Sequence, residues 1–163
     1  MRPCQAGDVE AIFAIVNDAA QAYKGVIPAD RWHEPYMPLD ELKAEIAAGV
    51  AFSGWEEAGG LKGVMGIQPV QDVHLIRHAY VVTASQGQGI GAALLRHLLA
   101  RTPGRILVGT WAAASWAVRF YQRHGFALTD TATKTRLLKT YWTVPDRQIE
   151  TSVVLDYQGG TVP

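Results

Sequence analysis

Three glycines at alternate positions carry the clearest chemical signal in the sequence. They lie in the run Gln86-Gly87-Gln88-Gly89-Ile90-Gly91-Ala92, which follows an apolar segment ending at Tyr80-Val81-Val82 and precedes an apolar segment with helical spacing. The first amides of a helix have no acceptor within the helix, and the helix dipole favours negative charge there. Glycines let an anion approach the backbone because no Cβ stands in the way. The run therefore predicts a phosphate-binding turn at the start of a helix.

Two ligand classes compete for this turn, because Gly87-x-Gly89-x-x-Ala92 also fits a loose dinucleotide-binding fingerprint. That fingerprint requires an acidic residue about 20 positions later to bind the ribose. The segment there, Leu107–Trp111, contains no acid, and the next acid is Asp130. The turn also lies in mid-chain after a predicted hairpin, so the dinucleotide interpretation fails its own requirements.

The charges are unevenly distributed, although 15 basic and 15 acidic side chains cancel to a formal net charge of zero. Residues 73–129 hold six arginines and no carboxylate, whereas residues 1–72 hold 11 acidic and 5 basic side chains. The carboxylate-free stretch indicates an anionic ligand; ion pairs between segments are the alternative. A nucleic-acid-binding domain would carry a larger basic excess, so we expect no nucleic-acid partner.

The composition limits the class of protein. A chain of 163 residues with 48% hydrophobic side chains is expected to form one domain, residues 1–163, with its own core. No apolar run approaches the roughly 18 residues that span a bilayer, and no apolar signal region begins the sequence, so we expect neither a membrane partner nor secretion. A single cysteine, Cys4, agrees with a reducing cytoplasm.

The histidines do not predict a metal site. Only His74 and His78 lie close together, on one face of a predicted strand, and two ligands fall short of a site. We therefore expect no metal.

The elements that position the turn follow from hydrophobic periodicity. A first helix begins at Asp8 as N-cap and runs to about Tyr23. A second, with Asp40, Glu41 and Glu45 outward, ends at Gly49. Further helices are predicted from 90 to about 102 and over 115–124, and strands over 50–55, 61–67, 73–82, 105–111 and 152–157. This order indicates an α/β domain with a mixed sheet.

Two motifs now resemble those of a known family. Gln86-x-x-Gly89-x-Gly91 is similar to the Q/R-x-x-G-x-G/A motif of the GCN5-related N-acetyltransferase (GNAT) family, and Ala117-Val-Arg-Phe120-Tyr121-Gln-Arg-His-Gly125-Phe126 resembles its downstream segment. Met1-Arg2-Pro3 before an acid-capped helix resembles its opening. The resemblance covers nearly the whole chain. It implies a mixed, mostly antiparallel central sheet flanked by helices, and transfer of an acetyl group from acetyl-CoA to a primary amine.

The resemblance also implies roles for particular residues. The end of the long strand would pair with the pantetheine arm, and the main-chain N–H near Val81 would polarise the thioester carbonyl. Tyr121 would protonate the leaving CoA thiolate. The residues that would bind acetyl-CoA are Ala79, Tyr80, Val81, Gln86, Gly87, Gln88, Gly89, Ile90, Gly91 and Ala92.

The sequence departs from the family pattern at two points. Many members carry an asparagine seven residues before the tyrosine, where this chain has Ala114, so Ser115 or a water would supply that contact. Many also carry a catalytic glutamate on the central strands, which here contain no carboxylate. His74 or His78 would then be the general base, and His78 lies closer to the presumed thioester. An amine that arrives neutral would need no strong base.

The acceptor site is expected to involve the aromatic segment after the first helix, with Tyr23, Trp32 and Glu34, and to be closed from the other side by Trp142. Glu34 would hold an ammonium group, and the aromatic rings would stack on it. Ordinary core packing of these rings is the alternative.

Three functions remain open from the sequence. The first is acetylation of a small-molecule amine, and the second is a catalytically weak CoA-binding regulatory module. The third is acetylation of a protein or an aminoacyl-tRNA. A sheet edge or the C-terminal strand is compatible with a homodimer.

Overall fold

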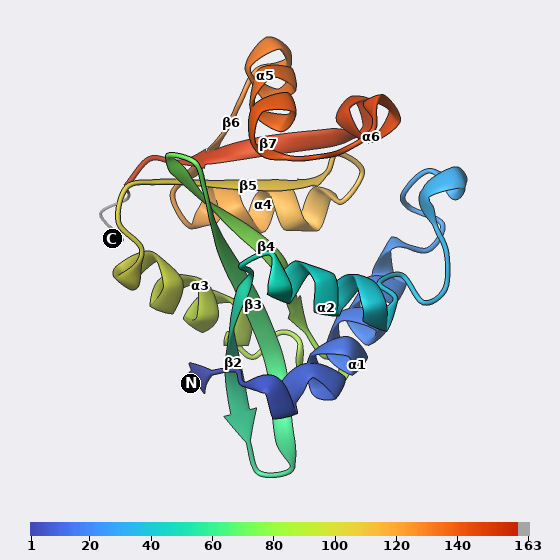
Figure 1. Cartoon of the computed structure of the whole chain (residues 1–163), viewed down its shortest axis with the longest axis vertical. Coiled ribbons are helices and arrows are strands. Elements are labelled where there is room, and N and C mark those ends of the chain that lie inside the picture. The colour runs from blue at the N-terminus through green and yellow to red at the C-terminus, as the bar shows by residue number, and fades with distance from the viewer. Residues whose placement is uncertain (160–163) are drawn as a thin grey trace.

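A computed structural model, which describes residues 1–159, arranges the chain as a seven-stranded sheet with helices on both faces (Figure 1). The strand order is β1-β2-β3-β4-β5-β7-β6, and within this part of the chain only β4 and β5 pair in parallel. The strands are β1 (Arg2–Pro3), β2 (Ala51–Glu57), β3 (Gly60–Val70), β4 (Val73–Val81), β5 (Arg105–Trp111), β6 (Phe126–Leu128) and β7 (Ser152–Tyr157). The predicted mixed, mostly antiparallel sheet is confirmed.

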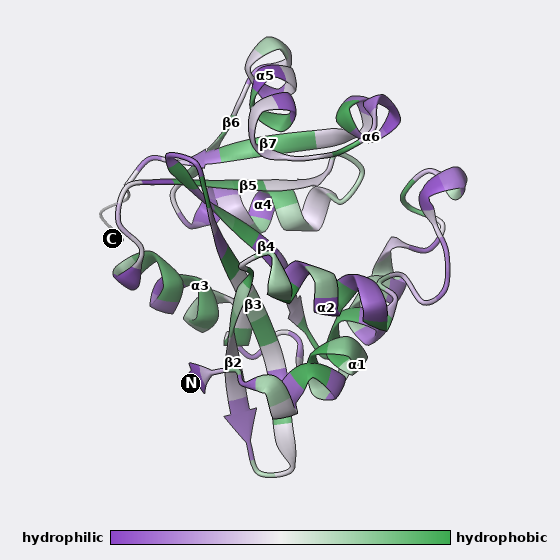
Figure 2. Cartoon of the chain, viewed as in Figure 1, coloured by the Kyte–Doolittle hydropathy of each residue, from purple (hydrophilic) through white to green (hydrophobic). Residues whose placement is uncertain are grey.

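The helices are α1 (Val9–Ala19), α2 (Leu39–Ala47), α3 (Ile90–Arg101), α4 (Ser115–Arg123), α5 (Thr131–Tyr141) and α6 (Asp146–Thr151). Short 3-10 turns lie at Ala6–Asp8, Ala20–Tyr23, Ala29–Arg31 and Thr83–Ser85. Hydrophobic residues concentrate on β3 and β7 and on parts of α1 and α3, while the end of β2 is hydrophilic (Figure 2). Burial of these apolar stripes fixes the helices on the sheet.

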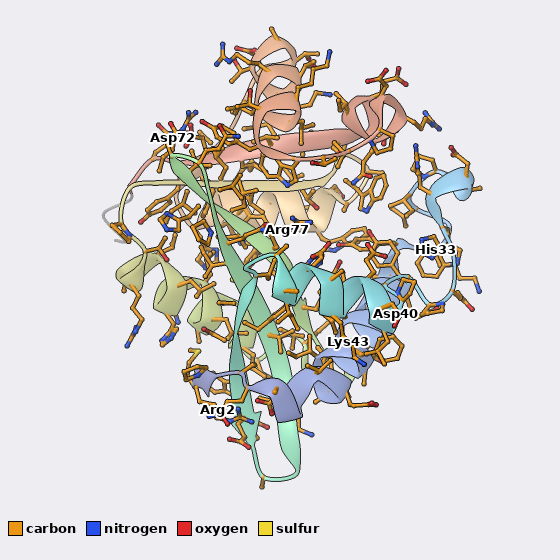
Figure 3. All side chains as sticks on the ribbon, in the orientation of Figure 1. Arg2, His33, Asp40, Lys43, Asp72 and Arg77 are labelled. Atoms are coloured by element: carbon orange, nitrogen blue, oxygen red, sulfur yellow. The ribbon has the colours of Figure 1, made fainter. Side chains whose placement is uncertain are left out.

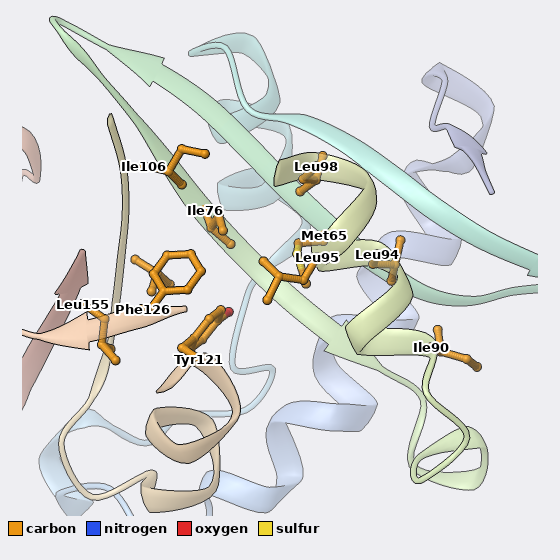
Figure 4. Close-up of a cluster of buried hydrophobic side chains, with 11 residues drawn as sticks. Met65, Ile76, Ile90, Leu94, Leu95, Leu98, Ile106, Tyr121, Phe126 and Leu155 are labelled. Atoms are coloured by element: carbon orange, nitrogen blue, oxygen red, sulfur yellow. The ribbon is translucent and has the colours of Figure 1, made fainter. Parts of the chain in front are cut away.

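The core is divided by the sheet. On one face, α1 and α2 cover β2 and β3, with Ile12, Val16 and Leu42 fully buried. On the other face, the apolar stripe of α3 packs with Tyr121 of α4 against Met65 and the central strands (Figure 4). The two faces thus hold independent clusters, and the long strand β4 contributes side chains to both.

A β-bulge interrupts β4. Val64 of β3 pairs with Tyr80, whereas Gly66, two residues further along β3, pairs with Arg77, so β4 holds one extra residue. His78 in the bulge has a φ of 55°, in the left-handed region that few non-glycine residues adopt. Gly66 faces this point, and a Cβ there would meet the Arg77 carbonyl oxygen at 2.7 Å.

The bulge breaks the alternation of side chains between the two faces of β4. Ile76 packs into the α3–α4 core, and strand alternation places His74 on that same face. Arg77 and His78 both reach Glu45 on α2, although they are adjacent in the sequence. The expectation that His74 and His78 share a face is therefore wrong, because a regular strand was assumed.

The parallel pair β4–β5 separates beyond the bulge. The last paired residues are Ile76 and Val108, yet β4 continues to Val81 and β5 to Trp111. The two strands thus part at their carboxyl ends, and the gap between them positions the site described below.

Several short or weakly patterned elements were not predicted. Strands β1 and β6 have two and three residues, too few for a periodic signal. Helices α5 and α6 were also missed; α5 buries only Leu137 and Leu138, and the Asp130 carboxylate caps it by accepting a 2.7 Å hydrogen bond from the Thr133 amide.

Asp8 lies at the N-cap of α1, as predicted, but its side chain does not cap that helix. The carboxylate accepts hydrogen bonds from the Arg2 guanidinium and from the Gln5 amide, which lower its pKa to about 2. The pair ties β1 to the start of α1.

We expect Gly66→Ala to lower the free energy of unfolding by about 1–3 kcal/mol, because its methyl group would overlap backbone that the bulge holds in place. Urea denaturation measures the change. Gly7→Ala is the control, since a Cβ there meets no atom within 4 Å. Equal unfolding midpoints for the two variants would contradict this view of the bulge.

Candidate functional site

A cavity of about 650 Å³ opens where β4 meets the starts of α3 and α4. The glycine-rich turn forms one wall, the end of β4 forms the floor, and α4 forms the opposite wall. The residues predicted to bind acetyl-CoA that line it are Ala79, Tyr80, Val81, Gln86, Gly87, Gly89, Ile90, Gly91 and Ala92. The glycine-rich turn and the end of β4 thus line the same cavity.

The turn directs backbone donors into this cavity. Gly87 and Gly89 have φ values of 78° and 81°, which turn the chain sharply into α3. The first hydrogen bond that continues into α3 runs from the Ala93 amide to the Gly89 carbonyl. The amides of residues 90–92 lie in the first turn of α3, where the helix offers them no carbonyl acceptor. They are therefore available to an anion.

The exposed edge of β4 adds another donor. The Val82 amide donates to the Lys62 carbonyl of β3 at 2.9 Å. Because hydrogen bonds alternate along an antiparallel strand, the preceding amide, that of Val81, is directed away from β3 and into the gap. The Gln86 side chain donates to the Val81 carbonyl at 3.1 Å and so ties the turn to the strand end.

A second, smaller cavity of about 180 Å³ lies beyond the gap, between β4, β5 and the segment after α1. Arg77, His78, Trp111, Trp142 and Gln148 are among the residues that line it. The two cavities share five lining residues, which are Tyr23, Ala79, Tyr80, Ala117 and Tyr121. The arrangement can therefore bring two ligands together at the bulge.

Tyr121 lies at this junction. Its ring packs edge-on against Phe120 and Phe126, with ring centroids 5.1 and 5.4 Å away. Figure 4 shows Tyr121 beside Phe126 in the core. Burial, with a smaller effect of Tyr23, raises the pKa of the phenol well above its ordinary value. Like that of an unperturbed tyrosine, the Tyr121 hydroxyl is protonated at neutral pH and can serve as a proton donor.

Aromatic side chains form the roof of the smaller cavity. Tyr23 stacks on Trp116 at 6.0 Å and packs against Tyr36 at 5.3 Å. The Tyr36 hydroxyl accepts a 2.8 Å hydrogen bond from the Trp111 indole, which fixes the loop to β5. Burial raises the pKa of Tyr23, although a hydrogen bond with Tyr80 opposes the shift. Residues 24–38, between Tyr23 and α2, are thus held by side-chain contacts in addition to the backbone hydrogen bonds of the short 3-10 turns.

His78 does not stand alone on its strand. Its Nε2 hydrogen-bonds the carboxylate of Glu45, whose other oxygen accepts from the Arg77 guanidinium at 3.1 Å. Figure 3 labels Arg77, which extends from β4 near the middle of the molecule. Glu45 was predicted to point outward; that prediction is wrong, because its side chain is only 18% exposed.

Some predicted site residues lie outside both cavity walls. Ser115 and Gln88 are exposed, and neither lines the larger cavity. Trp32 stacks on Tyr36 at 5.8 Å behind the smaller cavity, and exposed Glu34 pairs with Lys24 at 3.3 Å. Of the predicted acceptor-site residues, Tyr23 and Trp142 line the smaller cavity.

Sequence reasoning missed several lining residues. Trp116, Phe120 and Arg123 line the larger cavity from α4. Their spacing of four and three residues places them on one helix face beside Tyr121, so helical periodicity could have found them. Glu45 offered no such signal, because nothing in the sequence pairs α2 with the bulge.

Other site classes receive no support from the described part of the chain. Among residues 1–159, no three His, Cys, Asp or Glu side chains are grouped closely enough to hold a metal ion. In the same range, no helix is both long and apolar enough to cross a bilayer.

A family model described as "Acetyltransferase (GNAT) domain" matches residues 16–139. This match covers most of the chain, so the protein belongs to the GNAT family and is an acetyl-CoA-dependent acyltransferase. The resemblance seen in the two sequence motifs is thereby confirmed. No curated relative matches the sequence significantly.

Solved structures share the fold at low sequence identity. The PaiA N-acetyltransferase from Thermoplasma acidophilum, in complex with coenzyme A, is 16% identical over 97% of both chains, with a TM-score of 0.71. The ribosomal-protein-alanine N-acetyltransferase from Brucella melitensis is 22% identical over 79% of this chain and 85% of its own, with a TM-score of 0.61.

A third structure is the N-acetylglutamate synthase from Neisseria gonorrhoeae, complexed with coenzyme A and N-acetyl-glutamate. It is 18% identical over 96% of this chain and 34% of its own, with a TM-score of 0.63. At such identities these likenesses establish the fold alone.

We expect Gly89→Val to weaken acetyl-CoA binding at least roughly tenfold, a loss of about 1.4 kcal/mol. A β-branched side chain at a φ of 81° strains the turn and disturbs the amides that follow it. Calorimetric titration measures the dissociation constant.

Gly104→Val is the matched control, since Gly104 has a φ of 77° but lies beyond the other end of α3. It should lose similar stability and keep its affinity. Equal affinities for the two variants would contradict a role of the turn in binding.

Proposed function

We propose that this acetyltransferase transfers the acetyl group of acetyl-CoA to a primary amine of a small molecule by direct attack. The observation that carries the proposal is the junction of the two cavities at the β4 bulge, with Tyr121 in both walls. One cavity would hold the acetyl donor and the other the amine. Holding both in one geometry supplies a large part of the rate.

The larger cavity suits coenzyme A. Its pyrophosphate carries the negative charge that the α3 amides and helix dipole favour, and Arg123 adds a positive charge to the wall. The pantetheine arm has the amide groups to pair with the free edge of β4. Acetyl-CoA, when bound, supplies the thioester carbonyl and the thiolate leaving group; Ser115 would require a water to reach it.

Each residue at the junction of the two cavities would serve a different step of the acetyl transfer. The Val81 amide would donate to the thioester oxygen as negative charge develops there. Tyr121, whose phenol is neutral at pH 7, would give its proton to the departing sulfur. His78, which lines the smaller cavity, would accept the proton that the attacking amine loses.

A compact acceptor suits the smaller cavity. Its volume is about 180 Å³, and Tyr36, Trp142 and Gln148 are among the residues that line it. A structure of the same fold holds N-acetyl-glutamate, a small acetylated amine. Within this proposal Tyr23 and Trp142 contact the acceptor, and Trp32 supports the wall by stacking on Tyr36. Glu34, predicted to hold the ammonium group, pairs with Lys24 and lies outside the lining residues, so it is given no contact here.

A panel of amines tests the proposed acceptor class. Release of CoA thiol would be followed with small primary amines, amino acids, ribosomal-protein N-terminal peptides and an aminoacyl-tRNA. Turnover confined to small amines or amino acids is expected. Turnover only with peptides or tRNA would replace the acceptor class. Tight CoA binding with no turnover would favour a regulatory module.

The remaining expectations belong to the same proposal. We expect a single domain over residues 1–163, of which 160–163 lie outside the described residues, acting in the cytoplasm without a metal. The sheet edge at β6 is compatible with a homodimer.

We expect Tyr121→Phe to lower kcat roughly 100-fold while the dissociation constant of acetyl-CoA changes less than about twofold. The phenylalanine keeps the ring packing and removes only the proton donor. Steady-state kinetics and calorimetry measure the two quantities.

Tyr157→Phe is the control, because that ring packs on Phe126 at 5.1 Å and lines neither cavity. It should leave kcat unchanged. If Tyr121→Phe lost acetyl-CoA binding instead of turnover, the acid role would be wrong.

A further inference from the structure

Three ionisable side chains meet where β4 bulges. One carboxylate oxygen of Glu45 accepts from the Arg77 guanidinium at 3.1 Å, and the other bonds Nε2 of His78. The side chains of His78, Glu45 and Arg77 are 15%, 18% and 25% exposed. Both oxygens of a largely buried carboxylate are thus engaged, one of them by the histidine in the cavity wall.

This contact determines which nitrogen of the imidazole carries hydrogen. An ionised carboxylate only accepts hydrogen bonds, so Nε2 must donate to Glu45. In the neutral ring the lone pair is then on Nδ1. The ring also stacks on Phe52 with centroids 6.2 Å apart, so both its tautomer and its orientation are constrained.

Resting on the function proposed above, we infer that Glu45 is a positioning residue: it holds the His78 proton on Nε2 and leaves Nδ1 free to accept a proton from the amine. The carboxylate missing from the central strands is supplied by α2. Glu45 contacts the reacting atoms only through His78, and it stabilises the imidazolium that forms after proton transfer.

The surrounding charges allow this role. Glu45 from α2 and Arg77 from β4 offset each other before proton transfer. Burial tends to raise the pKa of Glu45, but the hydrogen bond from His78 and the charges of His78 and Arg77 outweigh it and lower that pKa. Tyr23 and Tyr36, on the loop over the same cavity, have raised pKa values because they are buried, so they stay neutral. Glu45 is therefore the anionic partner of His78 at neutral pH.

The first test needs no acceptor. The imidazole nitrogens of ¹⁵N-histidine-labelled protein would be observed by NMR, with His78→Asn used to assign His78, because asparagine tolerates a positive φ. We expect wild-type His78 to be protonated on Nε2 and Glu45→Gln to show a mixture of tautomers. A mixture in the wild type, or the same single tautomer in both proteins, would overturn the inference.

Two control variants separate this effect from a loss of local structure. Asp40→Asn makes the same change of charge at an exposed position of α2, labelled in Figure 3, and should leave the tautomer unchanged. Arg77→Gln removes the other partner of Glu45 and should also leave the His78 tautomer unchanged. If Arg77→Gln mixed the tautomers as Glu45→Gln does, the cluster and not Glu45 would position the ring.

The second test uses the best amine from the panel. Glu45→Gln should lower kcat roughly 10- to 100-fold, less than the roughly 10²–10⁴ that a general base contributes. The KM for acetyl-CoA should not change. In the His78→Asn background the same change should cost less than about twofold. If Glu45→Gln lowered kcat as much in the His78→Asn background as in the wild type, or raised the KM for acetyl-CoA, the inference would be overturned. If no amine were turned over, the proposed function would be refuted, and the NMR result alone would decide whether Glu45 positions His78.

Discussion

One extra residue in β4 is the constraint on which the site depends. The bulge at His78 turns the strand, so that Ile76 is the last residue of β4 paired with β5 while the strand itself continues to Val81. The unpaired edge that results is normally a liability, because free backbone donors invite another strand. Here the gap is bounded by the α3 turn and by α4, and its donors face a cavity. A backbone irregularity on β4, rather than a loop, thus creates the place where two ligands can meet.

The same bulge explains the distribution of charge. By putting Arg77 and His78 on one face, it gives Glu45 two partners and leaves Ile76 in the core. The arginines of residues 73–129, the stretch without carboxylates, fall into two groups. Arg77 pairs with Glu45, and Arg105 pairs with Asp156 at 2.7 Å, while Arg123 lines the larger cavity. The ion pairs between segments are therefore observed for Arg77 and Arg105, whereas the anionic ligand stays a prediction, with Arg123 placed to contact it.

Much of the fold could be predicted from the sequence, because its main elements have strong local signals. The strands Arg105–Trp111 and Ser152–Tyr157 were predicted with the bounds observed, and the glycines located the start of α3. The bulge could not be predicted, because alternation along β4 has no local break that marks His78. The pair of Glu45 and His78 depends on that bulge and spans 33 residues, so Glu45 looked like an ordinary outward acid of α2. The junction of two cavities likewise exists only once β4 and β5 part.

Calorimetric titration of the wild-type protein with acetyl-CoA, with NADH as the comparison ligand, tests the central claim most directly. If the gap beside the bulge holds the acetyl donor, acetyl-CoA should bind with a micromolar dissociation constant and NADH should give no heat of binding. Absence of acetyl-CoA binding would contradict the account, because neither the α3 amides nor the free edge of β4 would then have their ligand. Equal binding of NADH would show that the turn recognises a pyrophosphate without selecting coenzyme A.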